Sequence, residues 1–293
     1  MTKILLLGGT GFIGRSLLNR LEQKNSVKIM IHNSNLQTTA EKFKGNILMK
    51  NSFFNEIREN ETIINLLGQL TTNESNFVES NIVGGINLLN SCLQKRIKKI
   101  ILISSINVYG ENLKRPSKEN DPLKPKTSYG LIKMITEQMY EYFSKTNGIN
   151  ITILRLAGIY GTNQNKGFLS QIIKSTKDKT IVPVCYNQGN QQRDMLYIDD
   201  AIDCILNVVN NPNDGFNIFN ISSGKRYSIN KLISIIEKIS KTKIVLKYSS
   251  KIPDEKCIWA DNSKAKKILN FNPKIDIETG LKDTINQFFH QHK

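Results

Sequence analysis

A short apolar run followed by three regularly spaced glycines, close to the start of the sequence, constrains this chain most. The run extends from Ile4 to Leu7, and Gly8, Gly11 and Gly14 follow it at intervals of three. Such a run is typical of a buried strand, and the apolar residues after the glycines recur with helical spacing. Backbone N–H groups in a glycine turn can approach a pyrophosphate, which the dipole of the following helix also favours. The sequence therefore predicts a strand, turn and helix that bind a dinucleotide.

Strand-like and helix-like segments alternate over the first half of the chain. The helical segments include 76–95 and 128–144. This alternation implies right-handed crossovers, and it predicts an α/β fold with a doubly wound parallel sheet of the Rossmann type. The expected strands are Ile4–Leu7, Val27–Ile31, Ile47–Met49, Thr62–Leu67, Lys99–Ser104 and Ile151–Leu156.

The pattern changes after Leu156, where glycines loosen the chain and no simple order of elements follows. We expect residues 1–156, together with about 195–210, to form the dinucleotide-binding domain. Residues 157–194 and 211–293 are then a smaller, mixed α/β lobe that binds substrate. Within these parts, Met195–Val209 has the periodicity of a packed helix, and Tyr227–Lys241 that of an amphipathic helix with Ser228 as its N-cap.

Composition narrows the class of protein further. The 293 residues are 39% hydrophobic, and the sequence has no segment that we interpret as a signal peptide or membrane helix, so we expect a cytoplasmic protein without a membrane partner. Its four cysteines lie far apart, which indicates reduced, structural thiols and no metal site. The net charge of +16 comes mostly from scattered lysines. We interpret it as a solvated surface that attracts anionic small molecules, and we expect no nucleic-acid partner.

A second motif lies near the middle of the chain. Tyr129 and Lys133 are four residues apart, so on a helix they share one face. Ser104 and Ser105 end a predicted strand, at the edge where open α/β sheets bind ligands. Side chains alternate along a strand, so the two serines point to opposite faces, and we interpret Ser104 as structural.

Together, the glycine motif and the Ser105, Tyr129 and Lys133 set resemble the extended short-chain dehydrogenase/reductase family, whose members modify nucleotide-activated sugars. The resemblance covers nearly the whole chain. Further matching segments are Asn65–Gly68, Asn81, Ser104–Gly110, Arg193-Asp194, Tyr197–Ala201 and Trp259–Ala265.

The resemblance implies a role for each site residue. Tyr129 exchanges a proton with the sugar, Lys133 holds the nicotinamide ribose and favours the tyrosinate, and Ser105 hydrogen-bonds the same sugar oxygen. The implied substrate contacts, with a nucleotide-diphosphate sugar, are Ser105, Asn107, Arg193 and Lys251. The implied cofactor contacts are Gly8, Gly11, Phe12, Ile13, Gly14, Arg15, His32, Asn33, Asn51, Leu66, Leu67, Gly68, Asn81, Tyr129 and Lys133.

Some positions depart from the family pattern. The second predicted strand is followed by His32 and Asn33 where NAD-preferring members have an acid, and Arg15 follows the third glycine. Both features favour NADP(H), with NAD(H) left open. Asn51 stands where the family has an adenine-contacting aspartate.

Ile106 and Asn107 replace the acidic pair of the family's dehydratases, so we expect no dehydratase activity. The main prediction is NAD(P)H-dependent reduction of a nucleotide-linked 4-keto-6-deoxy sugar, because the chain is compact and its ribose pocket suits cofactor exchange. The alternatives are an NAD-dependent nucleotide-sugar 4-epimerase and a non-catalytic dinucleotide-sensing or RNA-binding protein. The family commonly forms a homodimer, so the resemblance implies one here, for which helices 76–95 and 128–144 could form the contact.

Overall fold

The computed structural model describes residues 2–32, 36–68, 74–112, 114–211, 214–249 and 257–291. The chain packs into two compact units. Unit 1 comprises Met1–Val108, Ser128–Arg155 and Ile202–Phe219, and unit 2 comprises Tyr109–Thr127, Leu156–Ala201 and Asn220–Lys293. These compact units do not test the predicted dinucleotide-binding and substrate-binding domains. The limits expected for those domains, at about residues 156, 195 and 210, stay a prediction.

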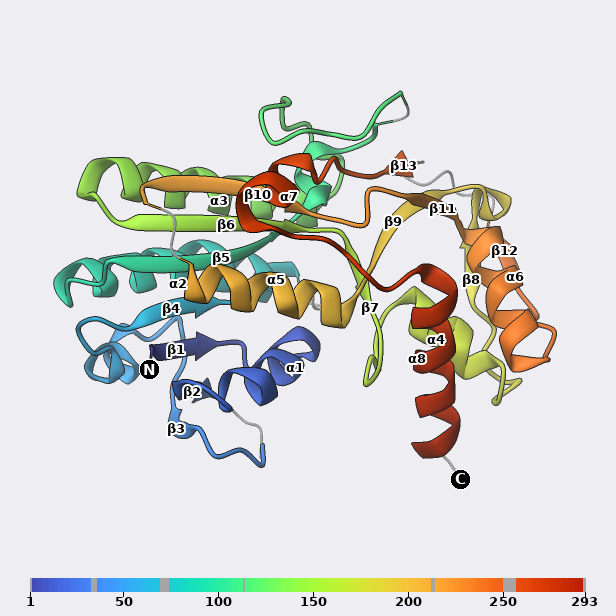
Figure 1. Cartoon of the computed structure of the whole chain (residues 1–293), viewed down its shortest axis with the longest axis horizontal. Coiled ribbons are helices and arrows are strands. Elements are labelled where there is room, and N and C mark those ends of the chain that lie inside the picture. The colour runs from blue at the N-terminus through green and yellow to red at the C-terminus, as the bar shows by residue number, and fades with distance from the viewer. Residues whose placement is uncertain are drawn as a thin grey trace. The chain divides into compact units, whose positions relative to one another are not determined.

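A seven-stranded sheet with the order β10-β6-β5-β4-β1-β2-β3 is the centre of unit 1 (Figure 1). Every pairing from β3 across to β5 is parallel. This confirms the predicted doubly wound α/β fold of the Rossmann type. The strands are β1 (Lys3–Leu7), β2 (Ser26–Ile31), β3 (Glu41–Lys44), β4 (Thr62–Asn65), β5 (Lys99–Ser105), β6 (Asn150–Leu156) and β10 (Phe216–Ile221).

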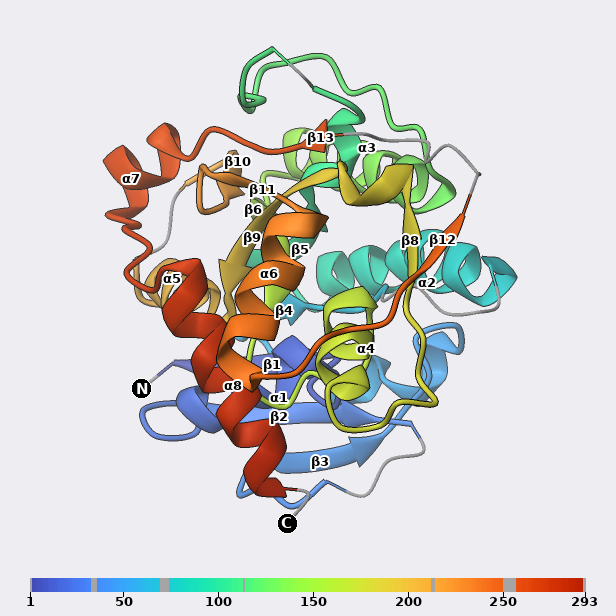
Figure 2. The same ribbon diagram turned by 90° about the vertical axis from the view of Figure 1, so that its right-hand side faces the viewer.

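Helices cover both faces of this sheet. In Figures 1 and 2, α2 and α3 lie on one face, and α1 and most of α5 lie on the other. An ion pair of 2.8 Å between Arg20 on α1 and Asp203 on α5 links the second pair. These helices are α1 (Phe12–Leu21), α2 (Glu74–Gln94), α3 (Ser128–Asn147) and α5 (Ile198–Asn210).

The core of unit 1 follows from the continuous apolar runs of its central strands. Leu5, Ile63, Leu102 and Ile153 lie on β1, β4, β5 and β6, and all are buried in one cluster. A parallel sheet covered on both faces requires such runs, because neither side of its strands meets water. Each such side chain contributes about 1.5–3 kcal/mol of transfer free energy.

One predicted strand is wrong. Ile47 is buried in the core cluster, but residues 47 and 48 form a turn. The Asn87 side chain donates hydrogen bonds of 3.2 and 3.1 Å to the carbonyls of Ile47 and Leu48, so a side chain satisfies these acceptors where a neighbouring strand otherwise would. The third strand of the sheet is the more polar Glu41–Lys44, which pairs with β2 at the edge of the sheet.

Unit 2 is a smaller α/β assembly. Its main sheet has the order β11-β9-β13, with β7 also paired to β9, and β12 pairs separately with β8. Figure 2 shows α6 and α8 packed side by side. The elements are β7 (Gly158–Tyr160), α4 (Phe168–Ser175), β8 (Val184–Tyr186), β9 (Gln192–Tyr197), β11 (Arg226–Ser228), α6 (Ile229–Ser240), β12 (Lys247–Ser249), β13 (Cys257–Ile258), α7 (Ser263–Leu269) and α8 (Ile277–Gln291).

Two helix predictions in this part of the chain can be compared with the structure. The Ser228 hydroxyl caps α6 by accepting a hydrogen bond of 3.1 Å from the Lys231 N–H, as predicted. The helix expected over Met195–Val209 begins later, at Ile198, because the residues from 195 to 197 belong to β9.

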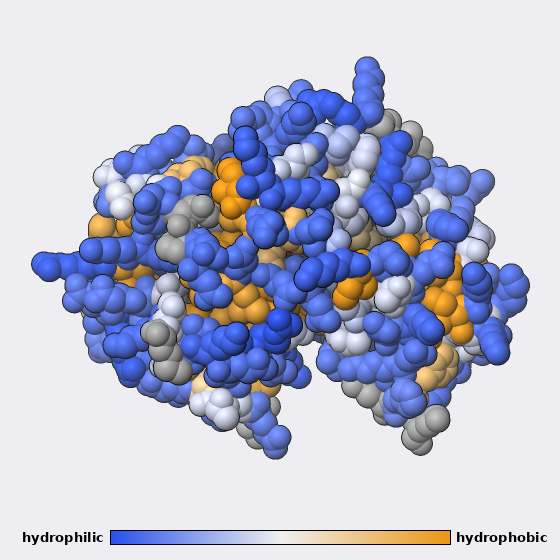
Figure 3. Space-filling model, in the orientation of Figure 1, coloured by the Kyte–Doolittle hydropathy of each residue, from blue (hydrophilic) through white to orange (hydrophobic). Residues whose placement is uncertain are grey.

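The face seen in Figure 3 is mostly hydrophilic, with hydrophobic residues in separate patches. All four cysteines are buried and unpaired, which fits the interpretation as structural thiols. In the described part of the chain, no helix combines the length and hydrophobicity needed to cross a membrane.

Candidate active site

The register of the central strands brings the predicted motifs of unit 1 to one edge of the sheet. Leu7 at the end of β1 pairs with Asn65 at the end of β4, and Asn65 pairs with Leu102 on β5. Because parallel strands end at the same edge, the turn after Leu7, the segment after Asn65 and Ser105 all lie at the carboxyl ends, where ligands bind.

The glycine turn has the geometry of a phosphate cradle. The Gly11 N–H donates to the Gly8 carbonyl at 3.1 Å, and a Cβ atom added to Gly14 would lie 2.1 Å from the Gly8 carbonyl oxygen. A side chain at position 14 is therefore excluded. No side chain caps α1, whose first turn contains Phe12 and Ile13, so its N–H groups suit the pyrophosphate of a nicotinamide dinucleotide.

The residues expected around the adenosine ribose are exposed. Arg15 bends back, and its Nε donates to the Thr10 carbonyl at 2.9 Å. His32 directly follows β2, and Asn51 lies in a 3-10 turn over Lys50–Ser52. Asn33 lies outside the described residues. The cofactor roles of these side chains stay predictions.

The segment after β4 packs closely on α2. The Leu66 N–H donates to the Leu7 carbonyl at 3.0 Å, which joins this segment to the end of β1. Gly68 has a φ of +102°, and a Cβ there would lie 2.2 Å from the Asn81 amide oxygen. The Asn81 amide nitrogen donates to the Phe77 carbonyl at 2.8 Å. Asn81 therefore binds the backbone of α2 and leaves no room for a side chain at position 68.

Phe77 is a site residue that the sequence reasoning missed. Its buried ring stacks on the ring of Tyr129, with centroids 5.4 Å apart and planes at 21°. Phe77 lies one helical turn before Asn81, so one face of α2 supports both the tyrosine ring and the Gly68 backbone. Helical spacing from Asn81 is the signal that could have pointed to it.

Ser105 and Asn107 orient one another beside Tyr129. The Ser105 hydroxyl donates to the Asn107 side-chain oxygen at 3.2 Å and accepts from the Asn107 N–H at the same distance. A hydrogen bond also joins the side chains of Ser105 and Tyr129. Burial raises the pKa of the Tyr129 phenol, whereas the bond to Ser105 lowers it. The phenol can therefore gain or lose a proton only with help from its surroundings.

Lys133 supplies a buried positive charge one turn along α3 from Tyr129. Its Nζ donates to the carbonyls of Leu67 and Ile103, each at 3.3 Å. Burial lowers its pKa to about 8, and the Glu137 carboxylate opposes this shift. A cation at this position stabilises a nearby tyrosinate or binds ribose hydroxyls.

In unit 2, Arg193 and Asp194 lie on β9 with side chains on opposite faces of the strand. Arg193 Nη1 donates to the Gln192 carbonyl at 2.9 Å. The buried Asp194 accepts hydrogen bonds from Ser223 and from the backbone N–H of Gly224. Desolvation raises the pKa of Asp194 to about 6, against these hydrogen bonds. Asp194 therefore organises the loop after β10, and the expected substrate contact Lys251 lies outside the described residues.

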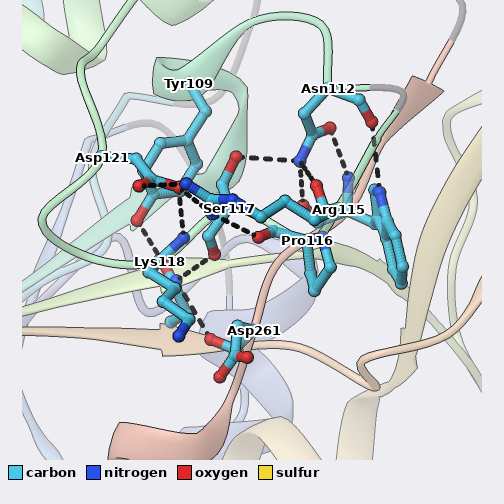
Figure 4. Close-up of polar contacts among 10 residues, drawn as sticks. Tyr109, Asn112, Arg115, Pro116, Ser117, Lys118, Asp121 and Asp261 are labelled. Carbon is cyan, nitrogen blue, oxygen red and sulfur yellow. Dashed lines mark hydrogen bonds and ion pairs between the residues drawn. The ribbon is translucent and has the colours of Figure 1, made fainter.

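The chain between Ser105 and Tyr129 passes through unit 2, where a network of hydrogen bonds fixes it (Figure 4). The Asn112 amide donates to the Ser117 hydroxyl at 2.8 Å and to the Trp259 carbonyl at 2.6 Å. The Trp259 indole donates to the Asn112 carbonyl at 3.1 Å. Figure 4 also shows Asp121 bound by Arg115 and by the Lys118 N–H.

Comparison with known proteins identifies the class to which this fold and motif set belong. The model of the NAD-dependent epimerase/dehydratase family matches residues 4–222. The chain belongs to this family, as its resemblance to the extended short-chain dehydrogenases and reductases implied. The family is NAD-dependent by its description, which agrees with the predicted nicotinamide cofactor.

Individual relatives extend over the whole chain. A Methanocaldococcus jannaschii protein, provisionally named a UDP-glucose 4-epimerase, is 32% identical over 97% of each chain. The crystal structure of a UDP-glucose 4-epimerase with UDP-glucose from Thermotoga maritima has 25% identity and a TM-score of 0.91 over 100% of both chains. A UDP-glucuronic acid 4-epimerase from Bacillus cereus, in complex with UDP-glucuronic acid and NAD, is 25% identical with a TM-score of 0.87, covering 99% of this chain and 100% of its own.

Proposed function

We propose that this protein is an NAD-dependent nucleotide-sugar 4-epimerase. The observation that carries the proposal is the convergence of Ser105, Tyr129 and Lys133 beside the glycine cradle in unit 1. The likeness to 4-epimerases over the whole chain supports the same conclusion. Bound NAD would supply a reversible hydride acceptor for C4 of the sugar. The uncapped start of α1 and the close approach at Gly14 fit this cofactor.

The protein side chains manage the proton. Tyr129 as tyrosinate would take the proton of the C4 hydroxyl while bound NAD would accept the C4 hydride, and the two losses together would give a 4-keto sugar. Tyr129 would later return the proton to the same oxygen. Ser105 would turn its single hydroxyl proton from the Asn107 side-chain oxygen to that sugar oxygen, while the Asn107 N–H continues to donate to the Ser105 hydroxyl oxygen. The Lys133 cation favours the tyrosinate, and the Phe77 ring fixes the plane of the phenol. Return of the same hydride from reduced NAD to the opposite face of the 4-keto sugar would invert C4.

This proposal replaces the reductase that the sequence favoured. One argument for the reductase was that the chain is compact beside typical 4-epimerases. The chain covers 97% of a provisionally named 4-epimerase and 100% of a solved one, which counts against this argument. The other argument relied on His32 and Asn33 as an open ribose pocket. His32 is exposed at the end of β2, a position equally open to a retained cofactor.

The substrate class is proposed from the residues expected to contact the substrate. We propose a nucleoside-diphosphate sugar, whose diphosphate the guanidinium of Arg193 can bind with two parallel hydrogen bonds. Asn107 and Lys251 are further proposed contacts. The nucleotide is proposed to be UDP, because the named relatives act on or bind UDP-sugars.

We also propose a homodimer in the cytoplasm. Large apolar side chains are exposed along α2 and α3, which pack against one another. A second copy of the chain could cover them in a four-helix contact, because exposed apolar patches of this kind favour association between proteins. These side chains are Val78, Val83, Ile86, Leu93, Leu131, Ile135 and Tyr142.

The test is to assay freshly purified protein on UDP-glucose and on UDP-glucuronic acid without added cofactor. We expect conversion to the C4 epimer by enzyme that carries its own NAD, which mass spectrometry of the released ligand would identify. The Tyr129→Phe variant should retain NAD and lose the conversion. Stoichiometric consumption of added NADPH or NADH by a 4-keto-6-deoxy nucleotide sugar, with no epimerisation, would show that the reductase prediction was correct.

A further inference from the structure

A buried ion pair in unit 1 lies behind the candidate catalytic residues. Glu137 on α3 and Arg155 on β6 are 3% and 2% exposed. Arg155 Nε lies 3.1 and 3.0 Å from the two carboxylate oxygens of Glu137, and Nη2 lies 2.7 Å from one of them. The Ser104 hydroxyl donates to the other oxygen at 2.5 Å. The carboxylate is therefore held in a single orientation from two strands.

Glu137 lies one helical turn after Lys133, as Lys133 lies one turn after Tyr129. Residues four apart share a helix face, so the three ionisable groups form a row along α3. The direct partners of the Lys133 ammonium are the carbonyls of Leu67 and Ile103, which carry no net charge. Glu137 is thus the nearby anion that acts on Lys133.

The other elements packed around Lys133 contribute little charge in the described part of the chain. From β5, Ser104 and Ser105 present neutral hydroxyls. On α2, Glu79 is exposed and the buried Cys92 acts on Tyr140, two turns beyond Lys133 on α3. Arg155 on β6 forms an ion pair with Glu137, the last member of the row.

Stability alone does not explain this arrangement. Replacing a buried ion pair with packed apolar side chains is often neutral or stabilising, because both charges must lose their water. The ion pair of Glu137 with Arg155 also affects Lys133, because burial and the Glu137 charge have opposite effects on the pKa of Lys133. The charge of Glu137 raises the pKa of Lys133 against the effect of burial, and so favours the protonated amine.

We propose that Glu137, fixed by Arg155 and Ser104, is a positioning residue that keeps Lys133 protonated so that Tyr129 can ionise. The proposal rests on the roles of Tyr129 and Lys133 in the proposed function. Glu137 acts through Lys133 and needs no contact with sugar or cofactor.

The test is an ultraviolet titration of tyrosinate in the NAD-bound protein, with Tyr129→Phe as the reference that isolates the Tyr129 signal. The Glu137→Gln variant should lower the pKa of Lys133 and so raise the apparent pKa of Tyr129 by about one unit. The matched control, Glu137→Asp, keeps the charge and should shift it much less. Circular dichroism shows whether each variant is folded.

Equal tyrosinate titrations in wild type and folded Glu137→Gln, or equal shifts for Gln and Asp, would overturn the proposal and leave a structural role. If Glu137→Gln does not fold, the double variant Glu137→Gln/Arg155→Gln removes both charges of the pair. It should shift the titration in the same direction, and an unchanged titration again overturns the proposal. The measurement uses no sugar, so a failed epimerase assay with the expected titration would refute the proposed function alone.

Discussion

Lys28 and Lys133 are both buried lysines of unit 1, yet their surroundings differ. Lys28 on β2 lies 3.6 Å from a carboxylate oxygen of Glu56 and 3.8 Å from one of Glu61, and it also donates to the Glu56 carbonyl. Within the described part of the chain, the Lys133 ammonium donates hydrogen bonds only to carbonyls. Its nearby carboxylate, Glu137, is already shared with Arg155.

The difference separates a structural charge from an available one. Two carboxylates compensate the Lys28 ammonium, so its charge has little effect beyond its own pair. Lys133 is less completely compensated, and its positive potential can act on another anion, such as tyrosinate. Burial of a lysine is therefore weak evidence of function, and the nature of its partners is more informative.

Lys133 is proposed to stabilise the tyrosinate of Tyr129, so removing the Tyr129 hydroxyl should have the largest effect on turnover. The Tyr129→Phe variant keeps the ring on Phe77 and deletes only the hydroxyl. We expect NAD binding to persist while turnover falls by about 10²-fold or more, because no other group transfers the proton. Steady-state epimerisation and cofactor titration would check this. Turnover near that of the wild type would remove Tyr129 from the mechanism.

Much of this arrangement could be predicted from sequence, because it depends on local spacing. The glycine intervals, the run ending at Ser105 and the four-residue step from Tyr129 to Lys133 are all visible along the chain. The pairing of Glu137 with Arg155 depends on how α3 packs on β6, which no local pattern specifies.

The third strand was missed for a related reason. The apolar residues Ile47 and Leu48 predicted a strand, but their carbonyls bind Asn87 on a distant helix. The polar segment Glu41–Lys44 pairs at the sheet edge, where the exposure of all its residues except Phe43 is tolerated. Tertiary partners overrode local propensity in both segments.

Matched substitutions of the two lysines test the comparison directly. Lys133→Met should lower turnover by about 10²-fold while leaving stability unchanged or raised, because a desolvated charge is removed. Lys28→Met should destabilise the fold by about 3 kcal/mol, because Glu61 loses its buried partner, and leave turnover unchanged. Urea denaturation and epimerase assays measure both. Similar profiles for the two variants would show that their partners do not distinguish the lysines.

The pH dependence of stability gives a smaller effect with a defined sign. The pKa of Lys133 is lowered from 10.5 to about 8 in the folded protein. Between these values the unfolded chain binds more protons, so stability should rise with pH, by up to about 3 kcal/mol. Below about pH 8 both states are protonated and this contribution is constant. Denaturation of wild type and Lys133→Met from pH 7 to 10.5 tests it, and parallel curves would contradict the lowered pKa.

Substitution of Arg15 should produce the smallest effect, because water screens the interaction between its exposed guanidinium and the cofactor. Its Nε is bound to the Thr10 carbonyl, which holds the side chain beside the glycine turn. The sequence predicts that NADPH binds at least as well as NADH, since the residues directly after β2, His32 to Asn35, include no acid and Arg15 can meet a 2′-phosphate. The proposed epimerase uses NAD, so the measured preference also tests that choice of cofactor. Arg15→Ala should weaken NADPH binding by about tenfold, or 1.4 kcal/mol, and NADH binding much less. Fluorescence titration of both cofactors against both proteins measures the ratio. A tenfold preference of the wild type for NADH would overturn the inference, and so would equal losses for the two cofactors, because the charge of Arg15 would then not distinguish them.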